Sequence, residues 1–399
     1  MAVNLIRNSR VFFTTNLDNR GRVKIAALKD AASGMSTTNC FEIQVLEGMT
    51  FSQNTSVDTV TLNEAGAAPV RGQRSFNTAL EPVDFSFSTY MRPHNTGTAV
   101  TCEESLLWNA FAGVGAIGST SPQAAWTETA SAATLSLAES NKHQLQAFGL
   151  IILFDNGGYV IDNCALDSAT VDFGIDAIAA VAWAGKGAAI RVLTDAQADT
   201  ANPVVFSGTD FDNTAPDQAA AKNTSARYIT NKLSTLVVND GINDFVTTPG
   251  AGVYTIALTG GNITFNNNLT YLTPANLGIV NLPITYFTGT RAITGTINAY
   301  LKTGSLESGG LLADLLAGSA TTVDPKFTIN VQLGGPSTNL TGVEIKLPAA
   351  MLQIPTINTE QVISTTINFT AQGYAGSGSS IGYDITAANE ASIVYRAAV

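Results

Sequence analysis

The sequence predicts a mainly β protein, built as β-sandwich or barrel-like domains that carry one short helix each. Three observations lead to this fold class. Only 13% of the residues are charged and 35 are glycine, and Thr, Asn, Ser, Val and Ile crowd segments where helix formers would otherwise dominate. Several segments alternate apolar and polar residues with a period of two, whereas only two short segments have helical spacing. At 399 residues the chain exceeds one usual core, so we expect two domains.

Short blocks recur in the same order in both halves of the chain. The first block is Met49–Asn54 and again Ile263–Asn268, an alternating strand that runs into a polar turn. The second block is Phe85–Tyr90 and again Gly295–Tyr300, where the alternation points one set of side chains inward and the other outward. Each block predicts one strand in each half.

The third block predicts a short amphipathic helix in each half. Leu106–Gly113 and Leu311–Gly318 place apolar residues at helical spacing, and each ends on a glycine that suits a helix C-terminus. Each half is therefore expected to contain strands, one helix and then more strands, rather than alternating βαβ units.

Two further blocks predict the later strands. Phe148–Ile152 matches Phe327–Val331, and Val181–Gly185 matches Ile367–Ala371. The spacing between matched blocks shrinks along the chain because the first half carries extra residues, chiefly 117–145, which are rich in Ser, Thr and Ala. We expect this stretch to be a loop insertion.

The composition between the halves predicts a linker. Residues 195–227 are dominated by Ala, Asp, Asn, Thr and Gln, which cannot build a core. The predicted division is a first domain at 1–194, a linker at 195–227 and a second domain at 228–399. Tyr228–Val238 opens the second domain with a strand that faintly echoes Leu5–Phe13.

The charge balance argues against a protein that grips nucleic acid. With 31 acidic and 20 basic side chains the net charge is -11, which lacks the basic surface that phosphate binding requires. Acidity remains compatible with a surface past which DNA slides without sticking. We find neither a signal peptide nor an apolar stretch of about 18 residues, so a soluble protein made in the cytoplasm is expected. Cys40, Cys102 and Cys164 are widely spaced and are expected to be buried thiols.

The motifs that could carry chemistry are weak, and no catalytic, cofactor-binding or metal-binding residue is predicted. Gly113–Gly118 has the glycine spacing of a nucleotide loop, but it follows a helix instead of a strand. His94 and His143 lie in no hydrolase or metal motif and are expected at the surface. Asp172 and Asp176 could be considered as a glycosidase acid pair, but the alternation assigns them to a solvated strand face.

Two arginines beside an aromatic residue, Arg71 and Arg74, carry too little charge for a nucleic-acid site at physiological salt. They are better explained as partners in salt bridges between subunits.

The blocks resemble the tail tube proteins of long-tailed bacteriophages, specifically the type with a duplicated domain. The resemblance spans nearly the whole chain and is carried by five ordered motifs: Leu5–Phe12, Leu62–Gly66, Arg71–Asn77, Phe85–Tyr90 and Asn266–Pro274.

The resemblance implies a structural subunit of the virion tail, assembled in the host bacterial cytoplasm, whose two tube domains form trimeric rings of pseudo-sixfold symmetry that stack into a DNA channel. Implied partners are other copies of the chain, a tape measure protein inside, terminator and distal tail proteins at the ends, a sheath if the tail is contractile, and passing double-stranded DNA. Neither a membrane nor a cofactor is implied. Some relatives add an outer immunoglobulin-like domain; none is expected here, which implies a smooth tube.

Closing strands from neighbouring chains into a shared inner barrel would remove unpaired sheet edges. Six domains with about four strands each give about 24 strands and a backbone diameter on the order of 50 Å. Residues 54–77 and 266–282 are expected to form hairpin arms that reach an adjacent subunit or ring. The residues predicted to make contacts between subunits or rings are Asn54, Asp58, Asn63, Glu64, Arg71, Arg74, Asn267 and Tyr271.

The channel wall is expected to be acidic and rich in small hydroxyl side chains, with Asp172 and Asp176 as candidate acidic positions. Two other readings remain open at this point. A receptor-binding or capsid-decorating phage β-protein would share the composition but would have no reason to be duplicated, and a glycan hydrolase would need two facing carboxylates in a cleft.

Overall fold

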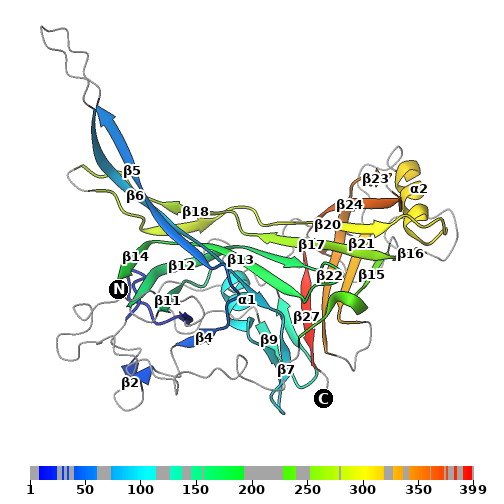
Figure 1. Cartoon of the computed structure of the whole chain (residues 1–399), viewed down its shortest axis with the longest axis horizontal. Coiled ribbons are helices and arrows are strands. Elements are labelled where there is room, and N and C mark those ends of the chain that lie inside the picture. The colour runs from blue at the N-terminus through cyan, green and yellow to red at the C-terminus, as the bar shows by residue number, and fades with distance from the viewer. Residues whose placement is uncertain are drawn as a thin grey trace, which may run out of the picture.

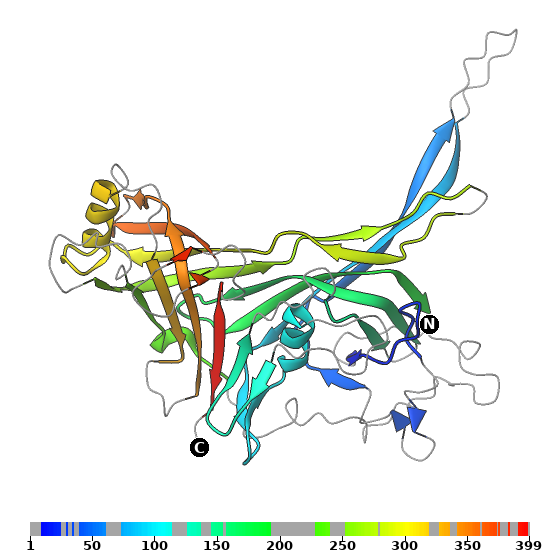
Figure 2. The same ribbon diagram turned by 180° about the vertical axis from the view of Figure 1, so that it is seen from behind.

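A computed structural model gives the fold of the chain. It describes residues 9–24, 29–30, 34–35, 40–60, 73–113, 126–136, 145–154, 157–192, 228–239, 252–277, 280–318, 327–335, 341–359, 361–372, 374–375, 382–383 and 390–397. These residues form a mainly β structure with two short helices, as the composition predicts (Figures 1 and 2). The predicted linker at 195–227 lies outside the described residues, and so do His143 and the glycines 115 and 118 of the nucleotide-like motif.

The first half of the chain, up to residue 192, contains one helix among its described strands. Helix α1 spans Ser105–Ala112, where helical spacing predicts it. The strands are β1 (Arg10–Thr14), β2 (Lys29–Asp30), β3 (Gly34–Met35), β4 (Phe41–Ile43), β5 (Thr50–Val60), β6 (Arg74–Tyr90), β7 (Pro93–Asn95), β8 (Val100–Cys102), β9 (Trp126–Glu128), β10 (Ala133–Ser136), β11 (Phe148–Phe154), β12 (Gly157–Asp172), β13 (Ala180–Gly187) and β14 (Ala189–Val192).

The second half, from residue 228, begins with a short 3₁₀ turn at Asn231–Leu233 and contains helix α2 (Ser308–Gly318), which again ends on the predicted glycine. Its strands are β15 (Thr235–Asn239), β16 (Val253–Ile256), β17 (Leu258–Asn266), β18 (Leu269–Leu272), β19 (Thr285–Thr288), β20 (Ala292–Tyr300), β21 (Phe327–Leu333), β22 (Gly342–Leu352), β23 (Thr356–Asn358), β24 (Ser364–Ala371), β25 (Tyr374–Ala375), β26 (Gly382–Tyr383) and β27 (Ser392–Arg396).

Strand pairing follows the same order in the two halves. In the first half neighbouring strands run β4, β1, β11, β12, β13, β6, β5, all antiparallel. In the second half they run β16, β15, β21, β22, β24, β20, β17, again all antiparallel. The last strand of each half also takes the same place, because β14 pairs with β12 and β27 pairs with β22.

For the second sequence block, the strand pairing aligns the two halves two residues away from the alignment that the sequence suggests. Phe51 lies opposite Phe85, and Phe265 lies opposite Ile293. Phe85 therefore corresponds to Ile293, whereas the block comparison aligned it with Gly295. The shift of two keeps the same face inward, which is why the sequence pattern alone could not detect it.

Two strand ladders join the two halves, and isolated bridges also pair Ile178 with Thr230 and Ala79 with Asn281. Strand β12 pairs with β17 from Ser168 opposite Asn266 to Asp172 opposite Asn262. The second joint is formed by the stretch 117–145, which was expected to be a loop insertion. Its described part contains the β9–β10 hairpin, and β10 pairs with the C-terminal strand β27. The loop prediction is therefore wrong there: a Ser- and Thr-rich segment still forms strands when a buried partner strand is available.

The main hydrophobic core runs through both halves, and a second, smaller cluster lies under β18 and β19. Trp108 of α1 is fully buried and packs edge-on against Trp183 of β13, with ring centroids 4.7 Å apart, and against Phe265 of β17 at 5.9 Å. The Trp108 indole also donates a hydrogen bond of 2.8 Å to the Tyr395 hydroxyl on β27. Cys40, Cys102 and Cys164 are buried free thiols, which confirms that prediction. Among the described helices, none has the length and apolar character needed to cross a membrane.

Candidate functional site

Eight strands, four from each half, form one continuous sheet along the long axis of the molecule. Their order is β5, β6, β13, β12, β17, β20, β24 and the end of β22. Figure 1 shows these strands passing from the first half, in blue and green, to the second half, in yellow and orange. Among the described strands, β5 pairs only with β6 and β23 only with β24, so the sheet has an open edge at each end.

One face of this sheet packs on the core. Phe85, Trp183, Ile263, Phe265 and Phe369 are all at most 3% exposed. Because side chains alternate along a strand, the residues between them point to the opposite face.

The opposite face is polar, small and almost uncharged. Asp84, Asp172 and Lys186 are its charged strand positions, and Asp167 at the β12 bulge lines a hollow together with Asp84 and Lys186. Lys186 Nζ lies 2.6 Å from Asp84 Oδ1, so that pair is neutral as a unit. The face consists of Thr50, Ser52, Asp84, Ser86, Ser88, Ser168, Thr170, Asp172, Ala182, Ala184, Lys186, Asn262, Thr264, Asn266, Thr294, Thr296, Asn298, Thr366, Asn368 and Thr370.

Of the residues on this face, only Asp172 was predicted from the sequence as a candidate position of the channel wall. The other positions carry a recognisable signal, since the strand blocks interleave Thr, Ser or Asn with large apolar residues, as in Ile263-Thr264-Phe265. Asp176, the second acidic candidate, lies beyond the end of β12, is exposed, and approaches Lys232 at 3.5 Å. The expectation that Asp176 belongs to a strand face is therefore wrong.

The hairpin of β5 and β6, here called arm 1, projects far from the body (Figures 1 and 2). Its described part runs to Val60 and resumes by Arg74, and Asn54, Asp58 and Arg74 are exposed on it. Strand β5 continues through two bulges, between Gln53 and Thr55 and between Ser56 and Val57, where the sequence predicted a turn. Three other predicted contact residues, Asn63, Glu64 and Arg71, lie outside the described residues.

The corresponding hairpin of the second half, β17–β18 with β19–β20, is here called arm 2. It bends at Asn268, whose φ of 52° is a left-handed conformation that Asn tolerates better than most residues. This is the polar turn that the sequence predicts. Beyond the bend, β18 and β19 lie over the first half of the same chain (Figure 1).

Arm 2 is anchored by tyrosines and an asparagine that are buried in the same chain. The Tyr271 hydroxyl donates to the Asn163 carbonyl, and the Tyr286 hydroxyl donates to the Leu145 carbonyl at 2.7 Å. Asn267 is 2% exposed and its Nδ2 donates to the carbonyls of Phe111 and Leu166 at 3.0 and 3.1 Å.

Asn267 and Tyr271 were predicted to contact another subunit. Their polar groups are instead used between the two halves of one chain. Tyr286 was not among the predicted contact residues. Its position in the alternating segment Thr-Tyr-Phe-Thr is the signal that places it on one face of a strand.

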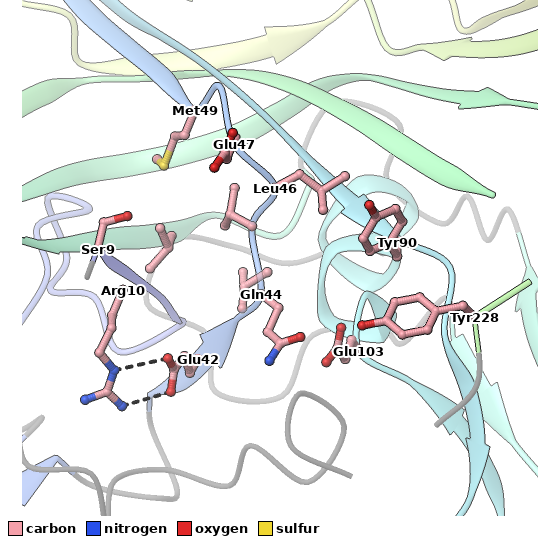
Figure 3. Close-up of a pocket in the computed structure, with 13 residues that line it drawn as sticks. Ser9, Arg10, Glu42, Gln44, Leu46, Glu47, Met49, Tyr90, Glu103 and Tyr228 are labelled. Atoms are coloured by element: carbon pink, nitrogen blue, oxygen red, sulfur yellow. Dashed lines mark hydrogen bonds and ion pairs between the residues drawn. The ribbon is translucent and has the colours of Figure 1, made fainter. Parts of the chain in front are cut away.

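A hollow of about 360 Å³ lies where β1, β4 and the end of β6 approach the start of the second half at Tyr228 (Figure 3). Two of its three glutamates, Glu42 and Glu103, are held by arginines. Arg10 donates to both oxygens of Glu42 at 3.1 and 2.8 Å, and Arg92, which stacks 4.7 Å over the Tyr228 ring, lies 3.0 Å from Glu103. Burial raises the pKa of Glu103 to about 7, and the Arg92 charge opposes that rise.

The β7–β8 hairpin contains a buried histidine. His94 is 1% exposed, so the prediction that it lies at the surface is wrong. Burial is the main cause that lowers its pKa. Within the described part of the chain, no cluster of three or more His, Cys, Asp or Glu residues could hold a metal ion.

Comparison with models of known protein families gives no match. Comparison with characterised proteins gives a relative that covers nearly the whole chain. The tail tube protein pb6 of Escherichia phage T5 is 31% identical over 381 residues, which is 93% of this chain and 73% of the relative. At this identity and coverage, the chain belongs to the family of phage tail tube proteins, and it is a structural component of a phage tail rather than an enzyme.

Proposed function

We propose that this chain is the ring-forming subunit of a tail tube and that it consists of two tandem tube domains, 1–194 and 228–399, connected by 195–227. The strand order that recurs in the two halves supports the tandem organisation. Copies of the chain assemble into rings, and rings stack into a tube that conducts DNA during ejection. The partners proposed from the resemblance are the tape measure, terminator and distal tail proteins, a sheath if the tail is contractile, and DNA that passes without specific binding.

The observation that carries this proposal is the joint between β12 and β17. At this joint β17, the first of the four sheet strands from the second half, pairs with β12 and so continues the four-stranded sheet of the first half. The corresponding strand of the first unit, β5, has an open outer edge, and so has the β22–β23 end of the second unit. If β5 of one copy pairs with β22–β23 of the next, the same joint is repeated between chains and both unpaired edges disappear.

Three copies would contribute about 24 strands in this way. With strands about 4.8 Å apart and tilted near 40°, the closed barrel has a backbone diameter on the order of 50 Å. Side chains take about 5 Å of each wall, which leaves a bore of about 40 Å. The polar face of the sheet would line this bore, since the opposite face is the hydrophobic core.

The open edge of the second half provides the test. Ile354 and Ile357 are exposed apolar residues there, at 52% and 46%. The double variant Ile354→Lys/Ile357→Lys should fold, because neither side chain is buried, but should not form rings, because lysines on an edge strand oppose pairing. A matched control is Thr98→Lys/Ser131→Lys, which adds the same charge at two exposed hairpin turns.

Electron microscopy of concentrated protein gives the readout. The wild type and the control should form hollow tubes of stacked rings, and the edge variant should remain as separate chains. Normal tubes from the edge variant would refute closure through this edge. Discrete wild-type particles of finite size would instead favour a decorating or receptor-binding role.

The composition of the polar face predicts how the channel treats DNA. Its described charged groups are Asp84, Asp172 and Lys186, with Asp167 of the β12 bulge beside them, so the duplex should meet weak repulsion and few attractive contacts. Asp172→Lys should replace an acidic group of the wall with a basic one without disturbing the core, because Asp172 is exposed. We expect Asp172→Lys tubes to retain short DNA duplexes at low salt and release them as salt rises, whereas wild-type tubes should retain none. Equal retention by both tubes would show that this face does not line the channel.

A further inference from the structure

The start of the second half is docked on the first half. In the segment before β15, the Ile229 carbonyl accepts a hydrogen bond of 2.8 Å from Ala179 N, and Asn231 N donates to the Ala177 carbonyl at 3.1 Å. Ile229 is 2% exposed, and the buried Nδ2 of Asn231 donates to the Gly174 carbonyl at 3.0 Å. Backbone pairing and two buried side chains thus hold this segment on the turn between β12 and β13.

Tyr228 extends the contact to the end of β6. Its ring packs edge-on against Tyr90, with centroids 5.3 Å apart, and the Arg92 guanidinium stacks 4.7 Å over it. Tyr228–Asn231 is here called the docking motif. It contacts two places in the first half, the end of β6 and the turn before β13.

The same four-residue pattern stands at the start of the first half. The docking motif reads Tyr-Ile-Thr-Asn, and Leu5–Asn8 reads Leu-Ile-Arg-Asn. The strands that follow the two segments are equivalent, because Val11 of β1 lies opposite Ile152 of β11 as Leu236 of β15 lies opposite Val331 of β21. Leu5–Asn8 lies outside the described residues, so its role is inferred from this correspondence.

The connection from motif to strand is two residues shorter in the first half. In the second half the extra residues belong to the 3₁₀ turn at Asn231–Leu233, which is closed by a hydrogen bond of 3.0 Å from Ser234 N to the Asn231 carbonyl. The ends of such a turn lie less than about 7 Å apart, and the Cα atoms of neighbours such as Asn8 and Ser9 lie about 3.8 Å apart. Loss of the turn therefore shortens the reach of the segment by only about 3 Å.

The second half exposes a hydrophobic patch at the place that corresponds to the docking site. Strands β20 and β24 are the equivalents of β6 and β13, and where β20 ends and β24 begins, Tyr300, Val362 and Ile363 are 47%, 60% and 45% exposed. The three lie together, because Tyr300 faces Ser364 and Leu301 N donates to the Ile363 carbonyl at 3.0 Å. We call these three residues the end patch.

The residue types of the motif and of its site change together between the halves. Counting from the equivalent pair Phe85 and Ile293, Tyr300 stands where Arg92 stands in the first half. A cation on an aromatic ring, Arg92 on Tyr228, would be replaced by an aliphatic side chain on an aromatic ring, Leu5 on Tyr300. Both combinations are favourable.

We propose that Leu5–Asn8 of one copy docks on the end patch of the adjacent copy, as the docking motif does within one chain. The contact rests on the ring proposed above, in which the first half of one copy follows the second half of its neighbour. Ile6, the equivalent of the buried Ile229, covers Val362 and Ile363. The occupant of the end patch is therefore a segment of a second copy of this chain.

Cross-linking between copies tests the contact. One chain carries Leu5→Cys and one affinity tag; its partner carries Val362→Cys and another tag. The matched control partner carries Thr98→Cys, which is also exposed but lies on the β7–β8 turn, away from β23 and β24 in Figure 1. The three native thiols are buried and do not compete. The chains are mixed, assembled and treated with a short bismaleimide.

We expect at least about tenfold more cross-linked heterodimer with Val362→Cys than with Thr98→Cys, because docking raises the effective concentration to the millimolar range. Adding Ile6→Asp to the Leu5→Cys chain should abolish this excess, and adding Ile6→Val should keep it. Equal yields from the two partners in preparations that contain rings would overturn the docking and leave the proposed function standing.

A second measurement separates docking between copies from docking within one chain. The double variant Leu5→Cys/Val362→Cys, diluted until no rings form, should give no internal cross-link. An internal cross-link under these conditions would overturn the proposal, because the segment would then reach the end patch of its own chain. A wild-type chain that forms no rings at high concentration would overturn the proposed function and the docking with it.

Discussion

A buried carboxyl group at the start of α1 gives the sharpest prediction for pH dependence. Glu104 is 0% exposed and lies between the core helix and the C-terminal strand. Burial raises its pKa from 4.5 to about 7; a backbone hydrogen bond and the Tyr395 hydroxyl oppose the rise, and the neighbouring Glu103 carboxyl adds to it. The variant Glu104→Gln replaces the carboxyl with a neutral group of nearly the same shape.

The folded chain binds a proton at Glu104 more tightly than the unfolded chain, because the folded-state pKa is the higher one. This group's contribution to stability is therefore complete below pH 4.5 and is lost as the pH rises toward and through 7. A shift from 4.5 to about 7 corresponds to about 3 kcal/mol of unfolding free energy. We expect Glu104→Gln to match the wild type near pH 5 and to exceed it by up to about 3 kcal/mol at pH 8.

Urea denaturation of dilute, unassembled protein at several pH values measures this difference. Comparing two variants at each pH cancels most contributions from groups they share, such as His94 and Glu103. Asp172→Asn is the control, since Asp172 is exposed and its loss should leave the pH profile unchanged. If the free energies of unfolding of Glu104→Gln and of the wild type differ by the same amount at pH 5 and at pH 8, the argument is refuted.

Three further changes test the packing. Tyr286→Phe removes the buried hydrogen bond to the Leu145 carbonyl and should lower the free energy of unfolding by about 1–2 kcal/mol in urea titrations; no change would mean that arm 2 is not held by this group. Gly185→Ala brings a Cβ within 2.4 Å of the Phe85 ring and 2.5 Å of the Ala165 carbonyl oxygen, so the same assay should show a loss of about 1–3 kcal/mol, and a neutral result would contradict the close packing. Burial raises the pKa of the three native thiols, so a thiol reagent should label them only in denaturant; labelling of native protein would contradict their burial.

The local elements were predictable because they depend on short-range patterns. Period-two alternation located β17 and β20, and helical spacing before a glycine located α2. The matching order of blocks in the two halves also anticipated where each strand falls along the chain.

Long-range placement was not predictable in the same way. A lone histidine such as His94 gives no sign of its environment, and its burial follows from the packing of the β7–β8 hairpin against β27. The β9–β10 hairpin is stabilised by β27, more than 250 residues later in the sequence, so its own composition suggested a loop. The hydrogen-bond partner of Tyr271 depends on whether arm 2 lies on its own chain or on another chain. The alternation of apolar and polar residues is the same in both cases.

The backbone joint between β12 and β17 also has a consequence for the formation of the proposed rings. Each association step costs translational and rotational freedom, estimated at about 4–15 kcal/mol. Folding of the chain makes this joint before any two copies meet, with the two halves tethered and at high effective concentration. A ring of three such chains would need two association steps where six separate domains would need five. In the proposed ring, joining the two halves in one chain thus favours closure even if each contact between chains is weak.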